Sequence, residues 1–174
     1  KSSLNISIHD KKIINKLRLP ETYITIALGG EWDYRTYKKW IIVIEKLIGD
    51  DAKLNIVLLG STNAKYFALE IMDKFNNFNL TDCVDRFTFN QTAEIIKLSK
   101  FLLCCDGGLM HAANAVNTPI VSLFARLSPE MQLTDSISNF SVYDKENVNN
   151  ILVEDVFEQY QAATNYVHRN HLGE

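Results

Sequence analysis

The sequence lacks most of the features that would place it outside ordinary globular proteins. Its 174 residues include only 3 cysteines, too few for a disulfide framework. A formal charge of -3 gives no overall basic surface, so the composition does not predict a nucleic-acid-binding protein. No apolar run reaches the roughly 20 residues that span a bilayer, and no short hydrophobic signal region opens the chain. With 47% apolar and 22% charged residues, the disordered, collagen-like and coiled-coil classes are excluded.

The three cysteines are Cys83, Cys104 and Cys105. The adjacent pair lies inside an apolar run, where neighbours on a strand point to opposite faces of the sheet. No second cysteine pair or histidine cluster accompanies them, so the sequence predicts no metal site. We interpret them as small buried side chains of a protein in a reducing compartment.

The length of the chain suits one domain with a sizeable core and is short for two. The chain begins with Lys1 rather than Met, and we expect it to be a piece of a longer protein. Residues 1–20 are predicted to form a leading segment, with a helix over about 10–17 that Pro20 stops. Residues 21–174 are predicted to form the domain itself.

Four short segments are almost entirely apolar and end at turn residues, as strands buried on both faces of a parallel sheet do. They cover residues 23–28, 54–59, 101–105 and 120–124. No repeat or low-complexity tract interrupts them.

Between these strands, apolar residues recur at helical spacing. The pattern predicts helices over 37–49, 64–75, 91–99, 109–116 and 153–167. Gly49 is the expected stop of the first, residues 61–63 offer caps for the second, and Asn90 is the expected cap of the third. Residues 126–139 are expected to be an irregular surface segment. The alternation predicts an α/β fold, a Rossmann-like three-layer sandwich with a parallel sheet.

The candidate site follows the third apolar strand, because ligands of such sheets bind beyond the carboxyl ends of the strands. Asp106 ends the strand, and Gly107 and Gly108 permit a tight turn with close approach of a ligand. A helix begins at once, so its free N–H groups and positive dipole end face the crevice. This arrangement predicts an anion site suited to phosphate, to which His111 could donate a hydrogen bond or a positive charge.

Each of these residues also has a simpler interpretation. Asp106 could merely cap the helix, and His111 could be a partly buried imidazole without a ligand. Lys38, near the start of a helix, could reach back over the crevice to a phosphate or remain a solvated lysine. The glycine-containing turns at the other strand ends suit a nucleotide but occur in many such turns, and they comprise Gly29, Gly30, Gly60 and Ser61. The dinucleotide and P-loop glycine patterns are absent, which disfavours NAD and P-loop chemistry.

Three sequence motifs in fixed order point to a known family. They are Lys38-Lys39-Trp40 opening a helix, Leu59-Gly60-Ser61 ending a strand, and Asp106-Gly107-Gly108-Leu109-Met110-His111-Ala112-Ala113 followed by Thr118-Pro119. With them, the segment 23–129 resembles the C-terminal half of glycosyltransferase family 9. The best-known members of that family are the ADP-heptose:lipopolysaccharide heptosyltransferases.

The resemblance implies a GT-B fold, in which two Rossmann-like domains face each other and the C-terminal one binds the nucleotide-sugar donor. It implies inverting transfer of a sugar, with ADP-heptose as the first guess, to a lipopolysaccharide-core or other glycan acceptor. It implies no cofactor and no obligatory metal. The general base and acceptor site would belong to the family's N-terminal domain, which is absent from this sequence, so we expect the isolated chain to transfer no sugar. The location implied is cytoplasmic, peripheral at the inner membrane.

The family's donor contacts carry over onto matching positions of this sequence. Lys38 would pair with the donor diphosphate, and Asp106 would lie at the edge between sugar and diphosphate. The backbone of Gly107, Gly108 and Leu109 would donate to phosphate, and His111 would support this cluster. Other nucleotide contacts would come from Gly29, Gly30, Gly60, Ser61 and Asn63.

The sequence also departs from the family pattern. Gly107 stands where Ser or Thr is usual, which removes a hydroxyl donor. A glutamate that can bind the ribose commonly follows the second glycine turn, but residues 62–65 contain none, and Asn63 is a weak substitute. Residues 125–129 differ from the usual Gly-Pro-Thr-Asp-Pro, and about two extra residues lie between Gly30 and Lys38.

Two alternatives therefore remain open. One is a nucleotide-sugar epimerase-like domain, although the region after the glycines lacks the Glu that such enzymes usually carry. The other is a non-catalytic module that binds a nucleotide or a partner. For either the transferase or the module we expect exposed apolar surface, with Tyr34, Tyr37 and the last helix as candidates.

Overall fold

The computed structural model describes residues 4–126 and 139–172. The strands are β1 (Ile24–Ala27), β2 (Ile56–Leu59), β3 (Leu80–Asp82), β4 (Leu102–Cys105), β5 (Ile120–Ala125) and β6 (Asn139–Asp144). The helices are α1 (Ile8–Asn15), α2 (Trp40–Asp50), α3 (Lys65–Lys74), α4 (Phe89–Leu98), α5 (Gly108–Ala115) and α7 (Val153–Leu172). Short 3-10 turns are η1 (Asp33–Arg35), η2 (Thr62–Ala64) and η3 (Val148–Asn150).

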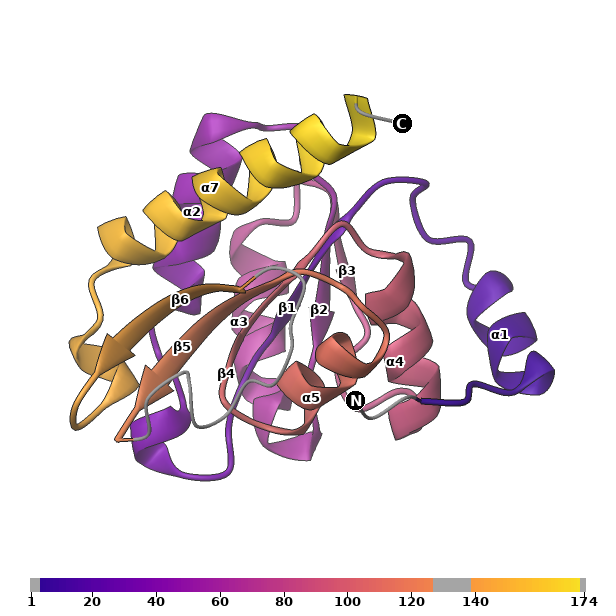
Figure 1. Ribbon diagram of the computed structural model, residues 1–174, viewed down its shortest axis with the longest axis horizontal. Coiled ribbons are helices and arrows are strands. Elements are labelled where there is room, and N and C mark those ends of the chain that lie inside the picture. The colour runs from indigo at the N-terminus through magenta and orange to yellow at the C-terminus, as the bar shows by residue number, and fades with distance from the viewer. Residues whose placement is uncertain (1–3, 127–138, 173–174) are drawn as a thin grey trace.

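The six strands form one sheet in the order β3-β2-β1-β4-β5-β6, and every neighbouring pair is parallel. The sheet twists through the middle of the molecule in Figure 1. The predicted α/β fold with a parallel sheet is confirmed. Strands β3 and β6, at the two edges, were not predicted, because β3 has only three residues and both carry polar side chains that an edge tolerates.

Helices cover both faces of the sheet and make it the middle of three layers. One core cluster joins the sheet to α2, α3 and α7, and a second joins its other face to α1, α4 and α5. Figure 1 shows α7 crossing over α2, and α1 lying outside α4. Because α1 contributes Ile14 to the second cluster, and Gln91 Nε2 donates to Asp10 Oδ1 at 3.1 Å, the leading segment packs on the domain.

Successive side chains along each buried strand point to opposite faces of the sheet, so they belong alternately to the two clusters. Cys105 faces the cluster that contains α2, whereas Cys104 faces the cluster that contains α4. All three cysteines are free and buried. The interpretation of the adjacent pair as small core side chains on opposite faces is confirmed.

Several predicted helix ends are wrong by a few residues. The cap of α4 is Thr88, not Asn90: Thr88 Oγ1 accepts from the N–H of Gln91, whose side chain accepts from the N–H of Thr88. Gly49 lies inside α2, which ends at Asp50. No side chain of residues 61–63 caps α3, because that stretch forms η2 instead. The predicted irregular segment 126–139 lies mostly outside the described residues, and its last residue begins β6.

The prediction that Tyr37 is exposed is wrong. The ring is buried against Trp40, with centroids 5.1 Å apart, and the hydroxyl donates to Ile151 O at 3.0 Å. Tyr37 therefore ties the start of α2 to the segment that leads into α7.

Candidate functional site

A cavity of about 500 Å³ lies at the carboxyl edge of the sheet, where β1, β2 and β4 end. Nine of the eleven predicted site residues line it, namely Gly29, Gly30, Gly60, Ser61, Asn63, Asp106, Gly107, Gly108 and Leu109. Turns that are far apart in the sequence thus meet in one place, as the parallel sheet predicts.

The glycines after β1 and β2 are required by the local backbone. Gly29 and Gly60 have φ of +84° and +154°, a region that L side chains rarely adopt. A Cβ on Gly30 would stand 2.6 Å from the carbonyl oxygen of Arg35. These turns therefore pack backbone against backbone, which leaves the space above the strand ends open.

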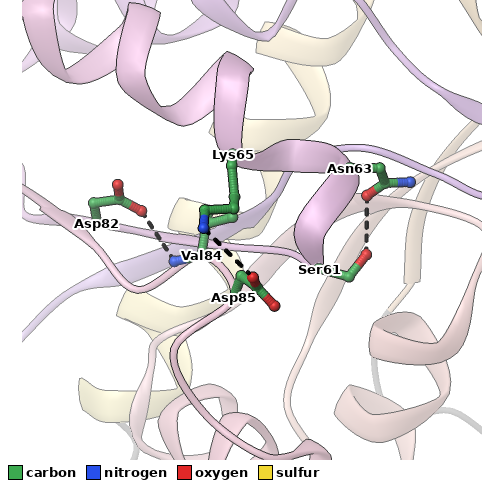
Figure 2. A network of polar contacts seen from close by, with 6 residues as sticks. All are labelled: Ser61, Asn63, Lys65, Asp82, Val84 and Asp85. Atoms are coloured by element: carbon green, nitrogen blue, oxygen red, sulfur yellow. Dashed lines mark hydrogen bonds and ion pairs between the residues drawn. The ribbon is translucent and has the colours of Figure 1, made fainter.

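Asn63 joins the two turns. Its Nδ2 donates to Gly30 O at 2.8 Å, and its Oδ1 accepts from Ser61 Oγ at 2.9 Å. Figure 2 shows this side chain turned toward Ser61. The amide thus supports the cavity wall, and the prediction that Asn63 contacts a nucleotide is untested.

The third turn opens onto the N-terminus of α5. No side chain caps this helix at Gly107, whose φ of 163° and ψ of -171° are extended. The first amides of a helix have no partner within the helix, so those of Gly108 and Leu109 are available at the cavity wall. Together with the helix dipole they make an anion-binding surface.

Asp106 lies beside these amides and is paired with an arginine that the sequence did not single out. Its Oδ2 is 3.6 Å from Nη2 of Arg35, which comes from η1. The two side chains are 5% and 21% exposed, respectively. Asp106 is therefore not the cap of α5, since the N-cap residue is Gly107 and no side chain caps this helix; its carboxylate instead faces a cation that also lines the cavity.

The opposite side of the cavity holds a second carboxylate, Asp85, which follows β3. Its φ is +57°, and its N–H donates to Gly60 O at 2.8 Å. Lys65 Nζ lies 3.8 Å from its Oδ2, as Figure 2 shows. Strained backbone at a cavity is a common feature of functional sites, and here it turns a carboxylate toward the second glycine turn.

Two predicted site residues do not line the cavity. Lys38 is exposed, and its N–H donates to Asn149 Oδ1 at 2.8 Å, which holds this part of the chain against η3. His111 is an exposed residue one turn into α5, with its N–H on Gly107 O at 3.3 Å. Their predicted roles toward a phosphate remain predictions.

Sequence reasoning missed several lining residues, namely Glu31, Arg35, Asp85, Phe87, Phe89 and Thr92. No periodic pattern marks them, since they lie in turns or at a helix start. For Arg35, the signal available was a basic residue in the extra-long turn between Gly30 and Trp40. For Asp85, it was a carboxylate just after the apolar pair Cys83-Val84, which could mark the end of an edge strand.

Within 4–126 and 139–172, no helix is long and apolar enough to cross a membrane. Over the same residues, no group of three or more His, Cys, Asp or Glu side chains could hold a metal ion.

Known proteins resemble the chain in sequence and in fold. The chain is similar to the structure of E. coli ADP-heptose lps heptosyltransferase II, with a TM-score of 0.77, 21% identity, and coverage of 97% of this chain and 54% of that chain. It is also similar to E. coli heptosyltransferase WaaC with ADP (TM-score 0.72, 15% identity, 85% and 47% covered). A third similar structure is the UDP-GlcNAc 2-epimerase from Methanocaldococcus jannaschii (0.65, 14%, 89% and 42%). Comparison with curated protein sequences gives no significant match.

The chain thus spans about half the length of the heptosyltransferase structures that it resembles. At these identities the structural likenesses establish the fold, which heptosyltransferase and epimerase share. The sequence distinguishes between the two, because the family model described as glycosyltransferase family 9 (heptosyltransferase) matches residues 1–160. On this match over most of its length, the chain belongs to glycosyltransferase family 9.

Proposed function

We propose that the chain is the donor-binding domain of an inverting glycosyltransferase and that its cavity takes a nucleoside-diphosphate sugar. The observation that carries this proposal is the uncapped N-terminus of α5 at the wall of a cavity of about 500 Å³, a size that suits such a ligand. Residues 21–174 form this domain, and residues 1–20 lead into it.

The cavity offers different chemistry to the two ends of the ligand. The diphosphate lies at the amides of Gly107, Gly108 and Leu109, with Asp106 between it and the sugar. The nucleoside lies over the turns that contain Gly29 and Gly60, near the carboxylate of Asp85, because carboxylates accept hydrogen bonds from the hydroxyls of a ribose. Phe87, two residues after Asp85, adds aromatic surface to the cavity lining, whereas the ring of Phe89 lies beside Gly108.

In the transfer step, the bond between the anomeric carbon and the diphosphate breaks while an acceptor hydroxyl attacks from the opposite face. Negative charge grows on the diphosphate, and fixed N–H donors at a helix N-terminus stabilise that charge without reorganisation. The proton of the acceptor goes to a general base. We propose that this base and the acceptor site lie in a further domain or partner chain, so that these 174 residues alone transfer no sugar.

The first candidate donor is ADP-heptose, and the first candidate acceptor is a lipopolysaccharide-core or other lipid-linked glycan at the cytoplasmic face of the inner membrane. Family membership and the solved complex of a similar heptosyltransferase with ADP support the donor. Calorimetric titration with ADP, UDP, GDP and CMP tests the nucleotide. A preference for UDP would instead favour an epimerase-like domain, and binding of no nucleotide would favour an interaction module.

The variant Gly108→Pro tests the helix N-terminus directly. Proline suits the first position of a helix but has no N–H, and the extended Gly107 before it is compatible with proline. We expect the affinity for ADP to fall about tenfold to a hundredfold, the loss of one hydrogen bond to a charged group. The thermal midpoint should not fall.

The matched control is Gly108→Ala, which keeps the N–H. Its Cβ would meet only Phe89 Cε1, at an ordinary distance of 3.8 Å. The alanine variant should bind ADP as the wild type does. Equal ADP binding by both variants, measured by calorimetry, would contradict a diphosphate at this helix.

The variant Asp85→Asn tests the nucleoside end. Asparagine tolerates a positive φ well, so we expect the free energy of unfolding to change by less than about 1 kcal/mol. The affinity for ADP should fall, because an amide replaces a carboxylate that accepts from two hydroxyls, while the affinity for inorganic pyrophosphate should not change. A loss of affinity shared equally by both ligands would place the carboxylate elsewhere.

A further inference from the structure

The cavity has more carboxylate side chains than basic ones, which is unfavourable for binding a negatively charged diphosphate. Its lining includes three carboxylates, those of Glu31, Asp85 and Asp106, and of the lining residues that the structure describes, Arg35 alone is basic. A diphosphate placed at α5 would meet the carboxylate of Asp106 at close range. Like charges in a partly buried site repel strongly, and a cation beside both groups would relieve this repulsion.

Arg35 is held where it can be that cation. Its Cζ lies 5.5 Å from the centroid of the Tyr34 ring, and Cζ of Arg126 lies 3.7 Å from the same centroid. Arg126 is itself fixed, because its Nε donates to Glu146 O at 3.1 Å. The contact of the Arg35 guanidinium with an aromatic ring that a second guanidinium also contacts limits the positions of Arg35.

The guanidinium of Arg35 still has donors to offer. Its distance of 3.6 Å to Asp106 is an ion pair but too long for a good hydrogen bond. Its Nε is buried and has no hydrogen-bond partner. A planar group with five N–H donors can keep one edge toward a carboxylate and turn another toward a phosphate.

Lys38 is less well placed for this task. Asn149 fixes its backbone N–H, and the Nδ2 of the same residue donates to Thr36 O at 2.9 Å. The two hydrogen bonds hold residues 36–38 against η3, with the lysine side chain exposed and not part of the cavity lining.

We infer that Arg35 is a cation that binds the donor diphosphate and shields it from Asp106. This inference rests on the proposed function. During transfer the guanidinium would stabilise the charge that develops on the leaving diphosphate, as charge-assisted N–H donors do. Gly30 helps to place Arg35, because a side chain at position 30 would displace the carbonyl of Arg35.

The test compares Arg35→Ala, Lys38→Ala and the double variant Arg35→Ala with Asp106→Asn, each titrated calorimetrically with ADP and with adenosine. Arg35→Ala should weaken ADP binding about thirtyfold to a hundredfold, as expected for lost hydrogen bonds to a charged group. Adenosine binding should be unchanged. The double variant should recover much of the lost affinity, because it removes the unshielded carboxylate. Arg169→Ala, an exposed arginine in the last turn of α7, is the matched control.

Each outcome decides between explanations. Equal loss of ADP and adenosine affinity would mean that Arg35 only supports the fold of η1, and the inference would be wrong. A large loss in Lys38→Ala with none in Arg35→Ala would also overturn it. If the wild type binds no nucleotide, the proposed function fails; if it binds ADP and Arg35→Ala binds ADP equally, only this inference fails.

Discussion

Gly60→Ala should lower the free energy of unfolding by about 2–3 kcal/mol, a large loss for the addition of one methyl group. Gly60 has a φ of +154°, and an added Cβ would stand 2.7 Å from Ala64 Cβ and 2.8 Å from Leu28 O. Neither neighbour can move alone. Ala64 is fully buried in the core, and Leu28 is hydrogen-bonded to Leu59 at the strand ends.

The control for this substitution is Gly107→Ala. Gly107 is also a glycine of the cavity wall, but its backbone is extended and no atom lies within 4 Å of an added Cβ. We expect its free energy of unfolding to change by less than about 0.5 kcal/mol. Urea unfolding followed by circular dichroism measures both variants. Similar losses in the two would show that glycine is needed here for general flexibility, not for the space around Gly60.

We expect Gly60→Ala to weaken nucleotide binding as well, because the backbone of Gly60 holds a residue of the cavity wall. The carbonyl of Gly60 accepts from the N–H of Asp85. A shift of this turn would therefore move the carboxylate of Asp85. Stability and nucleotide binding should fall together in Gly60→Ala, whereas the variants of Arg35 should separate them.

The parts of the fold that could be predicted are those with a local signal. Buried parallel strands are short apolar runs, and a strand-glycine-helix passage such as 102–115 leaves little conformational choice. The cap of α4 also had a readable signal, since Thr88 and Gln91 match the capping-box pattern, but the prediction placed the cap two residues later. Edge strand β3 had only a weak signal, because Leu80 is its only apolar residue and the apolar pair Cys83-Val84 lies beyond its end.

The residues of the site also divide into those with a local sequence signal and those without one. Asp106 and the glycines follow directly from strand ends, so their meeting at one edge could be predicted. Arg35 enters the cavity because the long turn after Gly30 folds into η1 and brings this side chain to Asp106, a tertiary arrangement that no spacing encodes. Lys38 shows the converse: the resemblance assigned it a role, but a distant asparagine, Asn149, decides where its backbone lies.

The second large effect is expected at alkaline pH. Burial raises the pKa of the Cys105 thiol from 9.0 to about 12, and it raises the pKa of Cys104 well above 9.0. A thiol with a raised pKa in the folded state contributes its full stability below about pH 9, where both states are protonated. That stability is lost as the pH rises from about 9 toward 12, because the unfolded chain then releases protons that the folded protein retains.

The expected loss is large because two such thiols are adjacent. Each contributes about 1.4 kcal/mol per pH unit, so the pair should lower the free energy of unfolding by about 3 kcal/mol at about pH 10. Burial also raises the pKa of Tyr23 and Tyr37, and their contribution to the loss begins nearer pH 10. The wild type should therefore unfold in progressively less urea as the pH increases above 9.

The double variant Cys104→Ala with Cys105→Ala isolates the thiols from every other titrating group. Removing two sulfur atoms from the core costs stability at all pH values, and this cost is the same at pH 7.5 and at pH 10. Cys83, whose pKa is also raised by burial, is present in both proteins and contributes equally to their pH dependence. The variant should be less stable than the wild type at neutral pH and should lose less stability between the two pH values. Parallel pH dependences of the two proteins in urea unfolding would mean that the folded state already admits water or thiolate at this strand. In that case Cys104 and Cys105 could not be the buried core residues on either side of β4 that lead to Asp106 at its end.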